Sequence, residues 1–171
     1  MLVAGLTACE NDIRTVRMLG ADQLPDNRAS EVEIIYSDSA QVKIKIFAPV
    51  LENYEREGKK TVFPRGVYIE FFDSQGKVKS WLKANYAIYH DADSRMEARH
   101  NVVVMNEKGE KLNTEKLFWT RNDGKVFTND AVKITTRDEI ILGEGLEATE
   151  DFSDLKILNV TGTLERDVEN Q

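Results

Sequence analysis

The residue types that most often carry out chemistry in proteins are few in this sequence and stand apart. Cys9 is its one cysteine, which leaves no basis for a disulfide framework or a cysteine-based zinc site. The two histidines, His90 and His100, lack the close spacing of a metal-binding motif. Phosphate-binding loops and nucleophile elbows do not occur, and the acidic pair Glu150-Asp151 is typical of surface charge. We therefore expect no enzyme activity, no metal and no cofactor.

Cys9 has a context that indicates a different chemistry, the acylation of its thiol. The run Leu6-Thr7-Ala8-Cys9 resembles the bacterial lipobox, in which the cysteine receives a diacylglyceryl group and the chain is cut before it. The alternative is a buried free cysteine in a first strand or helix. The abrupt change to polar residues from Glu10 onward favours the lipobox, because it is typical of the end of a signal peptide.

The composition is that of a globular protein, and the net charge limits the partners that it can bind. Hydrophobic residues make up 41% and charged residues 31% of the chain, as in soluble globular domains. The net charge of −7 argues against nucleic acid as a partner, because phosphates require a basic surface. After Ala8 no apolar run approaches the roughly 20 residues of a membrane-spanning helix.

Apolar and polar residues alternate over most of the chain, at a period of two. Val132 and Ile134 should face one side of a strand, and Lys133 the other. Short runs of this kind, separated by turn residues, indicate an all-β fold. The clearest runs are residues 42–47, 67–72, 101–105 and 132–136.

Two turns of the same composition suggest an internal repeat. Asp73 and Gly76 enclose one turn, and Asn106 and Gly109 enclose the other. An Asp or Asn side chain caps such a turn, and Gly takes the left-handed backbone conformation at its end. A third turn is expected at residues 37–40.

A small residue recurs between apolar ones at a regular interval. It stands at Ala48, Ala84, Thr114 and Gly143, so that the repeating unit is 29 to 36 residues long. Each unit is expected to be a hairpin that cannot bury its apolar face alone, so that stacked copies bury a continuous one. The expected fold is an open, twisted antiparallel β-jellyroll built of stacked hairpins.

Alternation assigns a set of apolar side chains to a common interior. These residues either line a site for an apolar ligand or fill the core of a closed sandwich, and the pattern alone favours the packed core. The interior set comprises Ile69, Phe71, Leu82, Val102, Val104, Leu112, Leu117, Trp119, Val132, Ile134, Ile141 and Leu146.

These elements together resemble the LptC family, the periplasmic component of lipopolysaccharide export, in its Bacteroidetes-type form. The resemblance extends over residues 10–162 and depends on the order of several short motifs and on the repeat of about 30 residues. The better-known members have a single membrane-spanning segment at the N-terminus, whereas Cys9 here implies a lipid anchor. The motifs are Tyr36-Ser-Asp-Ser39, Ile46-Phe-Ala-Pro49, Pro64-Arg-Gly66, Ala84-Asn-Tyr-Ala87, Asn101-Val-Val-Val104, Leu112-x-Thr114 and Gly143-x-Gly145-Leu146.

What the resemblance implies is a carrier rather than a catalyst. The family receives lipopolysaccharide from an inner-membrane ABC transporter and passes it to a periplasmic bridge protein of the same fold. The implied location is the periplasm, with the protein anchored to the inner membrane. The expected organisation is a residual signal segment at 1–8, a lipidated tether at 9–30 and a lipid-binding β-jellyroll at 31–171.

The last strand is expected to dock the bridge protein, because an open jellyroll leaves its backbone groups unpaired there. Three other functions stay open, and one of them, a soluble bridge protein of the same fold, is disfavoured by Cys9. A carbohydrate-binding or adhesive lipoprotein would expose aromatic residues on an outer face, where Trp81 is the candidate, and a jellyroll hydrolase would need paired carboxylates in a cleft. The expected docking edge comprises Lys156, Ile157, Leu158, Val160, Gly162 and Leu164.

Overall fold

The protein is a single twisted antiparallel sheet of long, bent strands. The computed structural model describes residues 24–56 and 58–166, so Cys9 and most of the expected tether lie outside the described residues. Within these ranges the chain forms eleven strands and no helix. The strands are β1 (Asn27–Asp38), β2 (Gln41–Tyr54), β3 (Lys60–Phe63), β4 (Val67–Phe72), β5 (Val78–Ala84), β6 (Tyr86–His90), β7 (Arg95–Asn106), β8 (Lys111–Thr120), β9 (Lys125–Thr135), β10 (Glu139–Thr149) and β11 (Leu155–Glu165).

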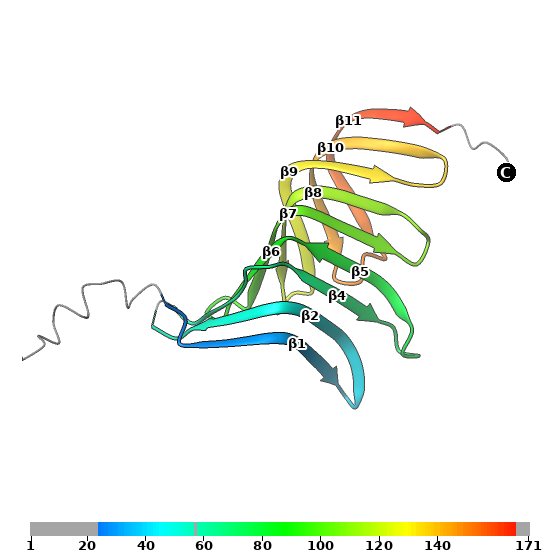
Figure 1. The fold of residues 1–171 in the computed structure, drawn as a ribbon. Helices are drawn as coiled ribbons and strands as arrows, with labels where there is room; N and C mark the ends of the chain where they lie inside the picture. The colour runs from blue at the N-terminus through cyan, green and yellow to red at the C-terminus, as the bar shows by residue number, and fades with distance from the viewer. Residues whose placement is uncertain (1–23, 57, 167–171) are drawn as a thin grey trace, which may run out of the picture.

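The sheet divides into two arms that face each other like the sides of a V (Figure 1). In the first arm the N-terminal part of β2 pairs with β4, β4 with β5, and β5 with the C-terminal part of β7. In the second arm the C-terminal part of β2 pairs with β3, β3 with β6, and β6 with the N-terminal part of β7. From β7 to β11 each strand continues through both arms, so the two faces enclose one interior.

The bends lie where the strand pairing shifts register. On β7 the shift falls between Arg99 and Val102, and His100 and Asn101 have φ angles of 63° and 53°. On β10 it includes Gly145, at φ 74°. Residues in the left-handed region interrupt the pleat and increase the local twist, which turns one long strand into two differently oriented halves.

The recurring small residues predicted from the sequence lie at these bends. Thr114 and Gly143 both pair with Val132, and Ala48 pairs with Val32 of β1. At Gly143 a Cβ atom would lie 2.7 Å from the carbonyl oxygen of Asn159, which is too close for any larger residue. At Gly143 the small residue of the ~30-residue spacing therefore meets a steric demand at the bend.

The two capped turns are nearly identical. The Asp73 carboxylate accepts backbone hydrogen bonds from Gln75 and Lys77, at 2.8 and 2.9 Å. The Asn106 side chain accepts the equivalent bonds from Lys108 and Glu110, at 3.0 and 3.1 Å. Each turn ends in a glycine at φ 78°, so the internal repeat extends to the hydrogen bonds of its turns.

The first strand begins earlier than the sequence suggested. Residues 27–30, which we had assigned to the tether, pair with residues 50–53 of β2. Their side chains are exposed, so this edge segment has no apolar alternation by which to recognise it. The prediction of an open jellyroll of stacked hairpins is confirmed, and no described helix could span a membrane.

Candidate lipid-binding groove

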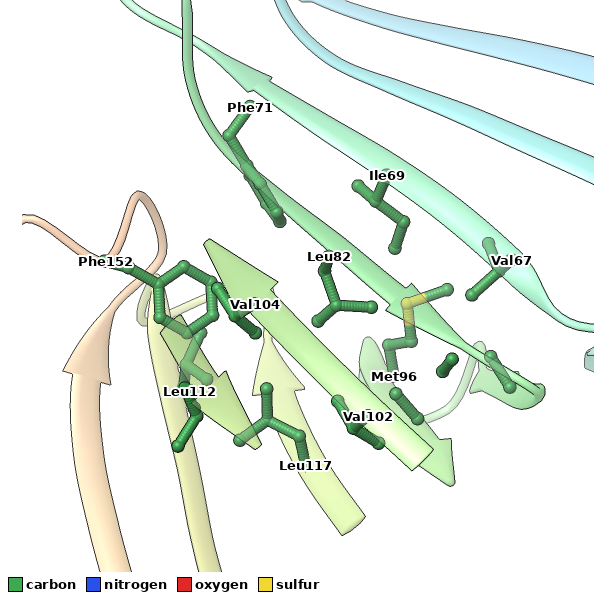
Figure 2. Close-up of a cluster of buried hydrophobic side chains, with 14 of the residues drawn as sticks. Val67, Ile69, Phe71, Leu82, Met96, Val102, Val104, Leu112, Leu117 and Phe152 are labelled. Carbon is green, nitrogen blue, oxygen red and sulfur yellow. The ribbon is translucent and has the colours of Figure 1, made fainter. Parts of the chain in front are cut away.

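The structure brings all twelve residues of the expected interior into one hydrophobic cluster between the two arms. Ten of them are buried, and Trp119 and Ile141 are partly buried against the rest. Lys133 is exposed on the opposite face of β9, as strand alternation requires. Side chains from β4, β5, β7 and β8 converge in the middle of the cluster, as Figure 2 shows. The shared face follows from the alternation, whereas contact with a lipid stays a prediction.

The middle of the interior is filled by side chains. A cavity of only about 20 Å3 remains between residues such as Ile69, Met96 and Leu117. A single water molecule needs about 10–15 Å3. The side chains around this cavity are packed like those of an ordinary core.

Toward β11 the same interior face opens into a groove. The groove has a volume of about 580 Å3, within the range of small-molecule sites. Its floor is apolar and consists of residues that continue the buried cluster, so a hydrophobic ligand in the groove would contact the protein core directly. The floor residues are Val104, Leu112, Ile134, Ile141 and Ile157.

The rim of the groove carries charges of both signs. Lys108, Lys111 and Lys156 alternate around it with three carboxylates, from Glu110, Glu139 and Asp154. An apolar floor beneath a polar rim suits an amphiphile, whose chains leave water while its head group stays solvated.

One residue of this site was missed by sequence reasoning. Phe152 lies in the loop between β10 and β11, yet only 3% of its side chain is exposed. Its ring packs edge-on against Phe71, with the ring centroids 6.1 Å apart. Phe152 belongs to no alternating strand pattern, and the available signal was a lone aromatic residue among the polar residues 149–154.

An ion pair fastens the same loop to β5. The Lys79 ammonium group donates a hydrogen bond to the Asp151 carboxylate over 2.7 Å, between residues 72 positions apart in the chain. Burial alone would raise the pKa of Asp151. Hydrogen bonds from Lys79, Ser153 and Thr149 outweigh burial and hold this pKa well below its usual range.

The outer face of the first arm carries a row of aromatic side chains. Phe47, Tyr68 and Trp81 lie on neighbouring strands, with successive ring centroids 6.2 and 5.9 Å apart. All three are half-buried, since each ring covers part of the next. Trp81 thus stands on the outer face, as its position in the alternation indicated.

The described residues hold no arrangement typical of an active site. Glu97 is buried, but its carboxylate pairs with the Arg99 guanidinium at 2.7 Å, which lowers the pKa of Glu97. No group of His, Cys, Asp and Glu among the described residues could hold a metal ion.

The expected docking strand is an edge of the sheet. Within the described part of the chain, β11 pairs with β10 alone, and β1 pairs with β2 alone at the opposite end. Leu158, Val160 and Leu164 of β11 are exposed, whereas Ile157 packs against the hydrophobic cluster. The strand thus combines a free backbone edge with exposed apolar side chains.

Bent strands, open edges and a continuous apolar interior define the class of protein: an open β-jellyroll built of stacked hairpins. The chain belongs to the LptC family, since the family model described as "Lipopolysaccharide-assembly, LptC-related" matches residues 25–165. Membership in this family implies involvement in lipopolysaccharide transport in the periplasm, and the family is one of transport components rather than enzymes. A comparison with curated proteins gave no match.

Proposed function

We propose that this protein is a membrane-anchored periplasmic carrier. It receives lipopolysaccharide from an inner-membrane ABC transporter and passes it to a bridge protein of the same fold. The observation that supports this proposal most directly is the groove beside β11, whose floor is continuous with the apolar interior. Acyl chains gain about 0.8 kcal/mol for each methylene removed from water, without directional bonds that would hold them in one place.

The test of lipid contact uses two neighbouring residues on opposite faces of β9. A photo-crosslinking residue at Ile134 faces the groove, and the same residue at Lys133 faces solvent. In cells that make lipopolysaccharide, we expect lipid adducts at Ile134 and none at Lys133. Equal labelling of both positions would show that lipid does not follow the interior face.

Transfer to the bridge protein is proposed to occur by strand addition at β11. The free backbone edge and exposed apolar side chains are the features that such an addition uses. Leu164→Asp places a charge on this edge at a side chain that is 57% exposed and lies outside the groove, so the fold should tolerate it. The matched control is Ile35→Asp on β1, where the side chain is 52% exposed.

We expect the β11 substitution to weaken binding of the bridge protein in a pull-down or by calorimetry, while the β1 control binds normally. Both variants should bind lipid as the parent does. Equal binding of the bridge protein by Leu164→Asp and the parent would assign the docking surface elsewhere.

Carbohydrate binding is the second candidate, and the outer aromatic row supports it. Aromatic faces stack on sugar rings, and Phe47, Tyr68 and Trp81 form a continuous strip on one face. The same contacts also stabilise neighbouring strands through cross-strand pairing. Titration with the delipidated saccharide of lipopolysaccharide distinguishes the two roles. Loss of saccharide binding in Trp81→Ala with unchanged lipid binding would identify a sugar platform.

A further inference from the structure

The loop between β10 and β11 starts and ends in the second arm of the jellyroll but reaches across to the first. It continues from the C-terminal part of β10, which lies in the second arm. Its Asp151 pairs with Lys79 of β5 and its Phe152 packs on Phe71 of β4, both in the first arm. The two contacts hold the arms together on the open side of the interior.

The loop is built around its own charged residue. The Asp151 carboxylate accepts hydrogen bonds from the Thr149 hydroxyl at 2.8 Å and from the Ser153 hydroxyl at 2.7 Å. Phe152 has a φ of 55°, a left-handed conformation that is uncommon for a bulky side chain. The turn thus holds the aromatic ring inward from an otherwise polar segment, pointing into the cluster (Figure 2).

Residues of this loop line two open spaces. On one side is the groove beside β11, whose wall includes Phe152. On the other is a cleft of about 480 Å3 toward β1, whose wall includes Glu150 and Asp151. Phe152 also lines the small cavity in the packed interior, so its ring stands where the groove meets the core.

We propose that the ring of Phe152 occupies an acyl-chain site, and that the loop is a latch that opens when an acyl chain takes the place of this ring. The inference rests on the proposed lipid carrier function. An acyl chain and a phenyl ring make the same kind of non-directional contact with Phe71, Val104 and Leu112. Exchange of one for the other keeps this apolar surface covered, while the Lys79–Asp151 pair returns the loop to its closed position afterwards.

The test locks the latch and asks how deep lipid then reaches. Lys79→Cys and Asp151→Cys are combined in a full-length Cys9→Ser background and joined with a short bismaleimide. The matched control is the same protein treated with N-ethylmaleimide, which modifies both thiols without joining them. A small diazirine residue at Leu117 reports lipid behind Phe152, and one at Ile134 reports lipid in the groove.

With purified lipopolysaccharide, the locked protein and the control should be labelled equally at Ile134. At Leu117 the labelling of the locked protein should be at least tenfold lower than that of the control. Lys79→Ala/Asp151→Ala, which frees the loop without any linker, should raise the labelling at Leu117 relative to Ile134. Thermal unfolding of each protein verifies its fold. Equal labelling of Leu117 in the locked and control proteins overturns the latch and leaves the carrier function standing. An unlabelled Ile134 in every protein overturns both.

Discussion

The substitution Val104→Asp tests whether the floor of the groove is packed core or solvated surface. Val104 lies on β7, pairs with Leu82 and Leu112, and has only 2% of its side chain exposed. A carboxylate at this position would lose its hydration without gaining a partner. Val103, the preceding residue, pairs with Lys83 and Asn113 and is half-buried on the outer face. Val103→Asp is therefore the matched control.

The expected cost follows from the burial of the carboxyl group. Burial in an apolar site raises a carboxyl pKa by about three units or more, and each unit corresponds to about 1.4 kcal/mol. A group kept neutral at pH 7 therefore costs about 4 kcal/mol. Loss of the buried valine surface adds about 1–2 kcal/mol. The sum of about 5–6 kcal/mol is comparable with the whole stability of a typical domain, which is about 5–15 kcal/mol.

Urea denaturation followed by tryptophan fluorescence measures this difference, since Trp119 packs against the same cluster. We expect Val104→Asp to be near the limit of folding at pH 7, and Val103→Asp to lose less than about 1 kcal/mol. Because the raised pKa favours the protonated form, Val104→Asp should regain stability relative to the parent as the pH falls from 7 toward 5. If Val104→Asp lowered the free energy of unfolding by less than about 1 kcal/mol, the assignment of a dry, packed floor would be refuted.

Three further predictions concern the anchor, a bend and the latch. In cells that export the protein behind a lipoprotein signal sequence, Cys9→Ala should move the protein from the membrane to the soluble fraction, and unchanged membrane association would exclude acylation of this thiol. Gly143→Ala should lower the free energy of unfolding by about 1–3 kcal/mol, because its Cβ would meet the Asn159 carbonyl. Gly162→Ala, with open space at the Cβ, should be nearly silent in the same urea titration. The lowered pKa of Asp151 makes its contribution to stability complete above about pH 4, and this contribution is lost as the pH falls further. The free energy of unfolding of Asp151→Asn should therefore fall less steeply below pH 4 than that of the parent. The same dependence on pH in both proteins would contradict the role of this carboxylate.

Sequence reasoning captured the features that depend on local rules. The opposite faces of Ile134 and Lys133 follow from the pleat alone, and the turns at Asp73 and Asn106 follow from side-chain capping. The small residues are visible in the sequence as a regular spacing. The structure shows that two of them, Thr114 and Gly143, lie at bends.

Other features depend on contacts between distant segments. Phe152 is buried because the β10–β11 loop reaches β4, which no local pattern indicates. The bend of β7 uses the left-handed residues His100 and Asn101 instead of glycine, so its sequence resembles an uninterrupted strand. The early start of β1 follows from pairing with β2 and leaves no apolar signature.

The bends of the long strands have a consequence for how such a protein can change its size. They give the interior its cross-section, because each long strand passes from one arm into the other at its bend. The number of hairpins sets only the length, since each adds two more strands of the same profile to an edge. Cross-section and length are therefore specified by different residues. A chain of this design can be lengthened or shortened by whole units of about 30 residues while the apolar interior keeps the same cross-section.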